Sequence, residues 1–296
     1  MSFARRTALV ALFSLAATFV CASILPARAD DANSLAAIKK RGTIKIGVKA
    51  DAPPFGSLNP LTNTLAGFDV DLAHAVAKHI LGDAKNVDLV IVKSDNRIPL
   101  VQNGNIDMFF ATATISPDRL KQIDFSNVYY KAGQALLVRK GSPIKSYRDL
   151  DGKTVCSLQG STPEQTIRKL VPKATVVTFE TYPECLTGLR NGRVDALTTD
   201  NVLLDGFEAQ DPSLEVVGGT FTYEAYGAGF KLGNTTLEHA VNDALADIRK
   251  SGEYGKMHLL WLKKPVPADI SSWYGQTPQA AAEAFAKAKA SIHAVK

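Results

Sequence analysis

The chain has 296 residues, of which 46% are hydrophobic and 21% charged; this composition excludes disordered, collagen-like and coiled-coil proteins and suffices for two domains. The formal net charge is +5, but the first 29 residues contain three arginines and no acid, which leaves 31 basic against 29 acidic residues, a net charge of +2. No basic run with interleaved aromatic residues remains, so a nucleic-acid partner is not expected.

The first 29 residues have the organisation of a secretory signal peptide. Arg5-Arg6 precedes an apolar segment over 8–20, and Ala27-Arg28-Ala29 places small residues around a cleavage site. The apolar segment is shorter than the roughly 20 residues that span a bilayer. We expect cleavage after Ala29, loss of Cys21 with the signal peptide, and a secreted mature protein.

Two cysteines then remain, Cys156 and Cys185. An even number of cysteines in an oxidising compartment favours a disulfide, with two buried thiols as the alternative. Closing a loop of about 30 residues would contribute roughly 3.5 kcal/mol in the chain-entropy model. We expect the two cysteines to be bridged.

Apolar segments of strand length alternate with helical patterns along almost the whole chain. This alternation is typical of α/β proteins in which crossover helices flank mostly parallel sheets. Two successive series follow the same order, from glycine and a strand to helix, Asn-Gly, strand and aspartate, which predicts two α/β lobes. The expected strands are 43–48, 87–93, 106–110, 153–158, 174–179 and 194–199, and the expected helices are 68–81, 96–102, 162–170, 181–190, 235–250 and 254–262.

Two extended segments, 130–138 and 223–230, separate the two series and predict paired crossovers between the lobes. Helical patterns follow the second segment, so the chain is expected to return to the first lobe and the two crossings to form a hinge. The Ala-rich stretch 278–296 has little apolar bulk and is interpreted as a terminal appendage. The expected boundaries are 30–131 plus 228–296 for lobe 1, 134–224 for lobe 2, and hinges near 130–134 and 224–228.

Motifs of catalysis, metal binding and nucleotide binding are incomplete or missing. The glycines at 227, 229 and 233 have the wrong spacing for a dinucleotide-binding turn, and 152–154 lacks the earlier glycine of a phosphate loop. The histidines have no cysteine or carboxylate at metal-ligand spacing. We therefore expect no cofactor, no metal and no catalytic residue.

One run is more specific, GFDVDL at 67–72, which is followed by apolar residues at helical spacing. Gly67 permits a turn into a helix, and Asp69 and Asp71 lie in its first turn, where the dipole favours anions. The run also resembles the signature of the periplasmic solute-binding proteins of family 3, which serve ABC importers of polar amino acids. The other matching segments are NRIPLVQNG at 96–104, which resembles the glutamate- and aspartate-binding subgroup, ATATISPDR at 111–119, GSTPE at 160–164 and TDN at 199–201.

The resemblance extends from about Gly42 to Leu262. It implies a type II periplasmic-binding-protein fold with two lobes, each a mostly parallel sheet flanked by helices, joined by a two-strand hinge. It further implies that the protein captures a free amino acid between its lobes by hinge closure and delivers it to the membrane permease of an ABC importer. We expect a monomer.

An α-amino acid presents a carboxylate and an ammonium, and the matching positions carry complementary groups. Arg119 offers a guanidinium that binds carboxylate bidentately; its alternative is a surface ion pair. Asp200 ends a strand, where ligands of open α/β sheets lie, and the family holds the ammonium there. The other ligand-binding positions implied by the resemblance are Ala111, Thr112, Thr114, Ser161 and Thr162, and helix capping is the alternative for the last two.

Ligand specificity is assigned to Lys49, Ser94 and Arg97, which match positions resembling the side-chain carboxylate pocket of glutamate and aspartate binders. Together with Arg119, they give three cations against Asp51 and Asp200, and a ligand of net charge −1 would balance the surplus.

Three features of this pocket leave alternatives open. Lys49 stands where similar proteins use arginine, and Tyr182 stands where some binders of acidic amino acids have histidine. A carboxylate at Asp51 helps related proteins to hold cationic or amide side chains. Glutamine or a cationic amino acid is therefore the alternative ligand. Phe55 is expected to cover the aliphatic part of the ligand, with a place in the core as its alternative.

An enzyme is the alternative from another class. Cyclohexadienyl and arogenate dehydratases resemble this fold but place an acid in the cleft. Glu164 is the one carboxylate that fits such a role, and stabilising the first turn of its helix is the simpler interpretation. We expect the protein not to be an enzyme.

Overall fold

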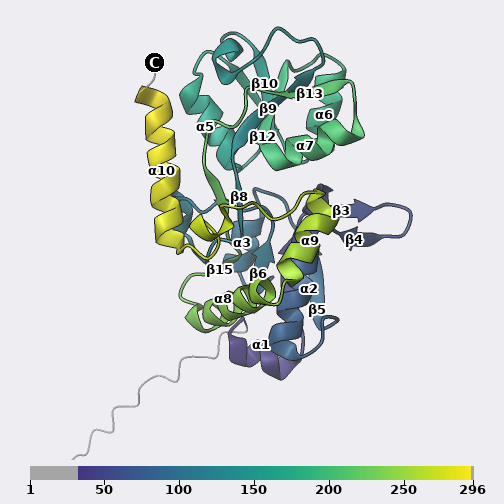
Figure 1. Ribbon diagram of the computed structural model, residues 1–296, viewed down its shortest axis with the longest axis vertical. Coiled ribbons are helices and arrows are strands. Elements are labelled where there is room, and N and C mark those ends of the chain that lie inside the picture. Colours follow the sequence, from purple (N-terminus) through teal and green to yellow (C-terminus); the bar gives the residue numbers. More distant parts are fainter. Residues whose placement is uncertain (1–32, 295–296) are drawn as a thin grey trace, which may run out of the picture. The chain divides into compact units, whose positions relative to one another are not determined.

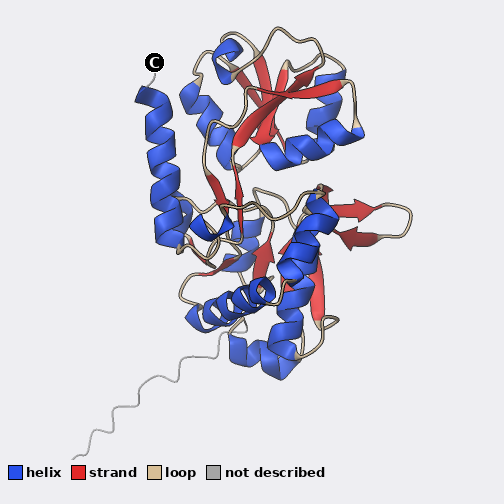
Figure 2. Cartoon of the chain, in the orientation of Figure 1, coloured by secondary structure: helices blue, strands red, loops and turns tan. Residues whose placement is uncertain are grey.

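The computed structural model describes residues 33–294, which form an α/β structure with two five-stranded sheets (Figures 1 and 2). The predicted signal peptide, its cleavage after Ala29, and Cys21 lie outside the described residues. Within the described part of the chain, no helix is both long and apolar enough to cross a membrane.

The first sheet has the strand order β5-β1-β6-β15-β7. Val87–Ile91 (β5), Ile44–Val48 (β1) and Met108–Phe110 (β6) run parallel to one another. Gly229–Lys231 (β15) is antiparallel to both of its neighbours, β6 and Ile123–Phe125 (β7). This sheet and the elements packed on it are called lobe 1.

Helix α2 (Phe68–Leu81) packs on the first sheet, and its bounds are those expected from the sequence. It buries Leu72, Ala73, Val76 and Ala77, which recur at helical spacing and face the sheet. Gly82 ends it in the left-handed conformation (φ 84°), which glycine adopts without strain. The other helices of lobe 1 are α1 (Leu35–Arg41), α3 (Arg97–Gln102), α4 (Pro117–Leu120), α8 (Thr235–Lys250) and α9 (Glu253–Leu262).

The second sheet has the order β11-β10-β12-β9-β13 and defines lobe 2. Thr175–Phe179 (β11), Thr154–Leu158 (β10) and Ala196–Asp200 (β12) are parallel, whereas Gln134–Arg139 (β9) is antiparallel to β12 and to Leu214–Val217 (β13). Its helices are α5 (Thr162–Leu170), α6 (Tyr182–Arg190), α7 (Asn201–Gln210) and the 3-10 helix η1 (Tyr147–Leu150).

Two short strands connect the lobes. Tyr130–Ala132 (β8) and Glu224–Tyr226 (β14) pair antiparallel, with Glu224 opposite Ala132. β9 follows β8 and β15 follows β14, and each of these two strands runs antiparallel to its neighbours. Each sheet is therefore mostly parallel, as expected, with one opposed strand, because the strand that enters each sheet from a crossing (β15 or β9) runs opposite to the other four.

A small three-stranded sheet, which the sequence patterns did not predict, stands beside lobe 1. It consists of Asp51–Ala52 (β2), Gly56–Asn59 (β3) and Thr64–Ala66 (β4), and β3 is paired antiparallel with both others. A side chain at Gly56 would meet the carbonyl oxygen of Lys49 at 2.2 Å. The absence of a Cβ at this position thus lets β3 lie directly against the end of β1.

Cys156 on β10 and Cys185 on α6 form a disulfide, as expected. Their Cα atoms are 5.9 Å apart, within the normal range for a bridge. Both cysteines are fully buried. The bridge joins the strand to the helix packed on it inside lobe 2.

The C-terminal helix α10 (Pro278–Ala294) differs from the appendage that the sequence predicts. It packs against α4 of lobe 1, against α5 of lobe 2 and against β14. Ala281, Ala282 and Phe285 on this helix are buried. Alanine has little bulk, so it brings the helix backbone close to its neighbours, and Phe285 supplies the larger apolar contact. A short 3-10 helix, Ile270–Ser272 (η2), precedes it.

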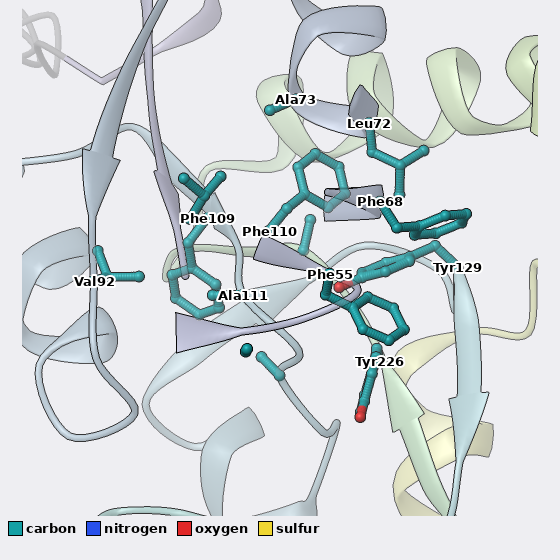
Figure 3. Packing of buried hydrophobic residues seen from close by; sticks show 14 of the residues in the cluster. Phe55, Phe68, Leu72, Ala73, Val92, Phe109, Phe110, Ala111, Tyr129 and Tyr226 are labelled. Atoms are coloured by element: carbon teal, nitrogen blue, oxygen red, sulfur yellow. The ribbon is translucent and has the colours of Figure 1, made fainter. Parts of the chain in front are cut away.

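The core of lobe 1 contains aromatic rings that meet edge to face (Figure 3). The ring centroid of Phe55 lies 5.6 Å from that of Phe68 and 5.6 Å from that of Tyr226. Phe110 and Tyr129 are 5.3 Å apart in the same arrangement, which aromatic quadrupoles favour. This packing joins the segment after β1 to β14, the strand that connects the lobes.

Candidate functional site

The strand ends of lobe 1 bring together three of the predicted site segments. β5, β1 and β6 are neighbours in parallel register, so their carboxyl ends meet at one edge of the sheet. Lys49 follows β1, Ser94 follows β5 and the segment 111–114 follows β6. Lys49, Ser94, Thr112 and Thr114 are all buried.

Lobe 2 presents an equivalent edge. Asp200 is the last residue of β12, Ser161-Thr162 begins α5 after β10, and Tyr182 begins α6 after β11. The Ser161 hydroxyl accepts a hydrogen bond from the Glu164 amide at 3.2 Å, so Ser161 does cap its helix.

Four contacts join these two edges. Arg119 Nη2 donates to the carbonyl of Gly160 at 3.1 Å, and the hydroxyls of Thr162 and Thr114 are 3.2 Å apart. The amide of Tyr182 donates to Oδ2 of Asp51 at 3.0 Å, and Lys93 pairs with Glu180. The predicted residues of both lobes therefore belong to one cluster.

Arg119 is buried rather than exposed on the surface, which argues against the surface ion pair. Its Nη1 donates to the carbonyl of Thr114 at 2.8 Å. Burial, followed by the nearby charge of Arg97, lowers its pKa to about 9, so the guanidinium remains charged at neutral pH. A buried cation held by neutral carbonyls is suited to receive a carboxylate.

Lys49 is a buried ammonium, with 1% of its surface exposed. Among the described residues, its Nζ has no hydrogen-bond partner and lies 3.9 Å from Oδ1 of Asp51. It also lies 5.5 Å from the ring centroid of Tyr182, within the range of a cation–π contact. Burial lowers the pKa of Lys49 to about 8, against the opposing effect of Asp51.

Arg97 is the third buried cation, at 2% exposure. Its Nη1 donates to the carbonyl of Ala111, and its guanidinium lies 5.9 Å from the ring centroid of Phe109. Its Nε has no partner among the residues that the structure describes. Burial lowers the pKa of Arg97.

Asp200 provides the buried carboxylate. Its Oδ2 accepts a hydrogen bond from the Tyr226 hydroxyl at 2.5 Å, and within the described part of the chain its Oδ1 has no partner. Burial, followed by the negative charge of Glu224, raises the pKa of Asp200 to about 8. An ammonium beside Oδ1 would offset this desolvation.

Thr112 adopts a left-handed backbone conformation, with φ 48°. This region is sparsely populated by residues with a branched Cβ and costs about 1–3 kcal/mol. Its amide donates to Oδ2 of Asp69 at 2.9 Å, deep in the structure. The loop after β6 is thus held in a strained form by a buried carboxylate.

Two buried acids of this region were missed by the sequence analysis as site residues. Asp69, interpreted there as a first-turn acid, holds the Thr112 loop, and burial raises its pKa to about 7. Glu224 is fully buried on β14 and bonded to Thr162. The available signal was a lone acid inside the extended apolar crossover at 223–230.

Two other predicted residues have clear local roles. Phe55 is fully buried in the aromatic cluster of Figure 3, so core packing is observed, and its contact with a ligand stays a prediction. Glu164 is the residue that would serve as the cleft acid if the protein were a dehydratase. It accepts hydrogen bonds from the Gly160 amide at 3.0 Å and from Arg168 Nε at 3.0 Å. These bonds are those of an acid in the first turn of a helix.

No group of three or more His, Cys, Asp or Glu placed to hold a metal occurs among the described residues.

The fold and this cluster of charges between two α/β lobes define the class of extracellular solute receptors. The family profile of the bacterial extracellular solute-binding proteins, family 3, matches residues 44–264, and the chain belongs to this family. Its fold is the two-lobed type II periplasmic-binding-protein fold.

Two relatives and one solved structure illustrate the similarity. The ABC transporter glutamine-binding protein GlnH of Bacillus subtilis is 41% identical over 262 residues, covering 87% of this chain and 96% of GlnH. The glutamate-binding protein GluB of Corynebacterium efficiens is 35% identical over 237 residues, covering 76% and 80%. An ancestral arginine-binding protein bound to glutamine is 40% identical, with a TM-score of 0.72, and the match covers 76% of this chain and 99% of that one.

Proposed function

We propose that this protein captures one polar amino acid between its lobes, outside the cytoplasm, and delivers it to the permease of an ABC importer. In this proposal it acts as a monomer in the periplasm after cleavage behind Ala29. Lobe 1 comprises 30–131 plus 228–296, lobe 2 comprises 134–224, and the hinges lie near 130–134 and 224–228. The observation that carries the proposal is the cluster of buried cations and buried carboxylate at the facing strand ends.

The α-carboxylate of the ligand is assigned to Arg119, with Thr114 and Ser161-Thr162 around it. Arg119 is buried and already bonded to segments of both lobes, so a carboxylate there would contact both at once. The ammonium is assigned to Asp200, whose Oδ1 has no partner among the described residues. Ala111 and Thr112 supply backbone from the strained loop.

The side-chain pocket favours glutamate or aspartate. Lys49 Nζ and Arg97 Nε are buried donors without partners in the described part of the chain, and Ser94 is buried at the same edge of the sheet as Lys49. Buried charges of one sign call for a counter-charge. A ligand carboxylate would supply it, which supports the dicarboxylic amino acids.

The charge balance depends on Glu224, which the sequence analysis did not count. If Glu224 were ionised, three cations would face three carboxylates and a ligand of net charge zero would fit. Burial raises the pKa of Glu224, and the charge of Glu224 raises that of Asp200, so the two buried acids do not readily ionise together and the pair keeps one proton. The surplus of one positive charge then persists and supports a ligand of net charge −1.

Glutamine is the second candidate. Asp51 lies beside Lys49 and partly compensates its charge, and an amide side chain offers both a donor and an acceptor to such a pair. The names of the relatives give both glutamine and glutamate as ligands of proteins similar to this one. The binding experiment must therefore distinguish glutamine from glutamate.

Hinge closure is supported by the hydrogen bonds between lobes. A ligand shifts a protein toward closure only if it binds the closed form more tightly than the open one. Arg119 and Asp51 of lobe 1 bond to backbone atoms of lobe 2, so a ligand bound between the lobes would contact both. Small-angle scattering should give a smaller radius of gyration on ligand addition.

The test of the ligand is a thermal-shift panel of amino acids on mature protein freed of ligand by unfolding and refolding. A ligand at about 100 times its Kd stabilises the fold by roughly 2.7 kcal/mol. Glutamate and aspartate leading the panel would support the Lys49, Ser94 and Arg97 pocket. If glutamine or a cationic amino acid gave the largest shift, Asp51 rather than the Lys49, Ser94 and Arg97 pocket would determine ligand specificity. The absence of any shift would contradict amino-acid binding and make prephenate turnover the next assay.

A further inference from the structure

Glu224 is a fully buried carboxylate on β14, one of the two strands that connect the lobes. Its Oε1 accepts a hydrogen bond from the Thr222 hydroxyl at 2.8 Å, and its Oε2 accepts one from the Thr162 hydroxyl at 2.9 Å. The Thr162 hydroxyl also lies 3.2 Å from Oγ1 of Thr114. Glu224 therefore contacts the residues to which the proposed function assigns the α-carboxylate.

The hydrogen of the Thr162 hydroxyl decides what this residue can do. A hydroxyl has one hydrogen to donate, and an ionised Glu224 can only accept it. In that state Thr162 has no hydrogen left for a ligand carboxylate. A protonated Glu224 instead donates its own hydrogen to Thr162 Oγ1, and the Thr162 hydrogen becomes free to turn toward the ligand.

The charged groups around Glu224 come from several elements. Burial raises the pKa of Glu224, and the charge of Arg119 on α4 partly opposes this rise. The charge of Glu224 raises the pKa of Asp200 on β12 and also that of Lys289 on α10, whose pKa burial lowers overall. Lys131 on β8 lies opposite Ala225, the residue after Glu224 on β14, and is paired with Asp269. Two buried carboxylates near one another do not readily ionise together.

We propose that Glu224 is a positioning residue that carries the proton of this carboxylate pair when the ligand is bound. The inference rests on the proposed function. The ligand ammonium keeps Asp200 ionised, and the ligand carboxylate near Thr162 disfavours a second negative charge at Glu224. Binding therefore places the proton on Glu224 and turns Thr162 toward the ligand.

The source of this proton depends on pH. At pH values at which the ligand-free pair of Asp200 and Glu224 holds one proton, ligand binding moves this proton from Asp200 to Glu224. No proton is then exchanged with solvent. Above about pH 8, the pKa of Asp200, the ligand-free pair loses its last proton and binding must take one from water. Affinity then falls as pH rises, by up to about tenfold per unit for one proton taken up.

The direct test is infrared difference spectroscopy of the wild-type protein near pH 8, with and without unlabelled glutamate. Protein labelled with carbon-13 in its glutamate residues moves the carbonyl band of a protonated Glu and leaves that of an Asp in place. Glu224 is the only buried glutamate in the described part of the chain. We expect the complex to show a label-shifted carboxylic-acid band. A complex without such a band overturns the proposal.

The second test compares the pH dependence of glutamate affinity in wild type and in Glu224→Gln. The amide of the variant permanently mimics the protonated acid, because it donates to Thr162. We expect the wild-type affinity to fall more steeply above pH 8 than the affinity of E224Q. The effects of Lys49 and of the ligand ammonium are present in both proteins and cancel in the difference. Parallel pH profiles would refute the proposal.

A matched control is Glu238→Gln on α8, because burial also raises the pKa of Glu238. This variant should keep the wild-type pH profile and the infrared band. If E224Q does not fold, the labelled wild-type spectrum still decides the question. Failure of the proposed function is distinct, since it would appear as the absence of binding by any amino acid in the thermal-shift panel.

Discussion

The backbone amide of Tyr182 donates a hydrogen bond to Oδ2 of Asp51 at 3.0 Å, and the same Asp51 lies 3.9 Å from Lys49 Nζ through its other oxygen. One carboxylate thus contacts a buried cation of lobe 1 and the helix start of lobe 2. Under the proposed function, this arrangement would connect the occupancy of the side-chain pocket to contact between the lobes. Replacing Asp51 should therefore affect both ligand rank and closure.

For Asp51→Asn we expect glutamate to bind more tightly relative to glutamine. The substitution removes the negative charge beside Lys49 while keeping an oxygen that accepts from Tyr182. Isothermal titration with both ligands would measure the ratio of the two affinities. A ratio equal to that of wild type would show that Asp51 does not set ligand rank.

Arg119→Ala should abolish the binding of every amino acid, because it removes the cation assigned to the group that all of them share. Losing one partner of a buried charge-assisted contact costs about 2–5 kcal/mol of binding free energy. Titration would measure the loss, and circular dichroism would verify folding. Lys121→Ala is the control, since that neighbouring lysine is exposed and pairs with Asp118.

Arg97→Ala should weaken the binding of dicarboxylic amino acids and spare glutamine, because Arg97 is assigned to the ligand side chain. The variant also leaves the Ala111 carbonyl without its donor, which should lower the free energy of unfolding by about 1–3 kcal/mol. Denaturant unfolding and titration separate these effects. Equal losses for glutamate and glutamine would contradict the specificity assignment.

Lys49→Met should stabilise the ligand-free protein at pH 7 while removing dicarboxylate binding. Burial lowers the pKa of Lys49 to about 8 in the folded protein, against 10.5 for a lysine in water, so below pH 8 the folded state bears the whole penalty of a buried charge, of the order of 3 kcal/mol. The penalty declines as pH rises from 8 to 10.5. The advantage of the variant in unfolding free energy should therefore shrink over that range, and a constant advantage would contradict this account.

Truncation after Gln276 should destabilise the protein, because α10 packs on α4, α5 and β14. Phe285→Ala should reproduce part of the loss, about 3 kcal/mol if its site resembles a core position. Exposed Lys287 on the same helix offers the matched control, Lys287→Ala. Denaturant unfolding would measure all three, and wild-type stability of the truncated chain would restore the appendage interpretation.

Local patterns in the sequence were sufficient for the main elements. The apolar spacing and terminal glycine of α2, and the Ser161 cap of α5, are short-range features that predicted both helices at their observed bounds. The alternation of strand and helix patterns predicted two sheets, because parallel strands that follow one another in the chain are joined by crossover helices. The small β2-β3-β4 sheet was missed because its strands have two to four residues, too few for a pattern.

The candidate site was predicted at the level of residues by the segments that resemble family 3, and its chemistry agreed with the charges of those residues. The sequence by itself determined the family, the pair of lobes and the list of candidate cations. Only the tertiary structure decided that α10 packs on both lobes and that Glu224 lies against Thr162. Burial and charge proximity between residues far apart in the chain have no local signature, because they arise when separate elements pack together.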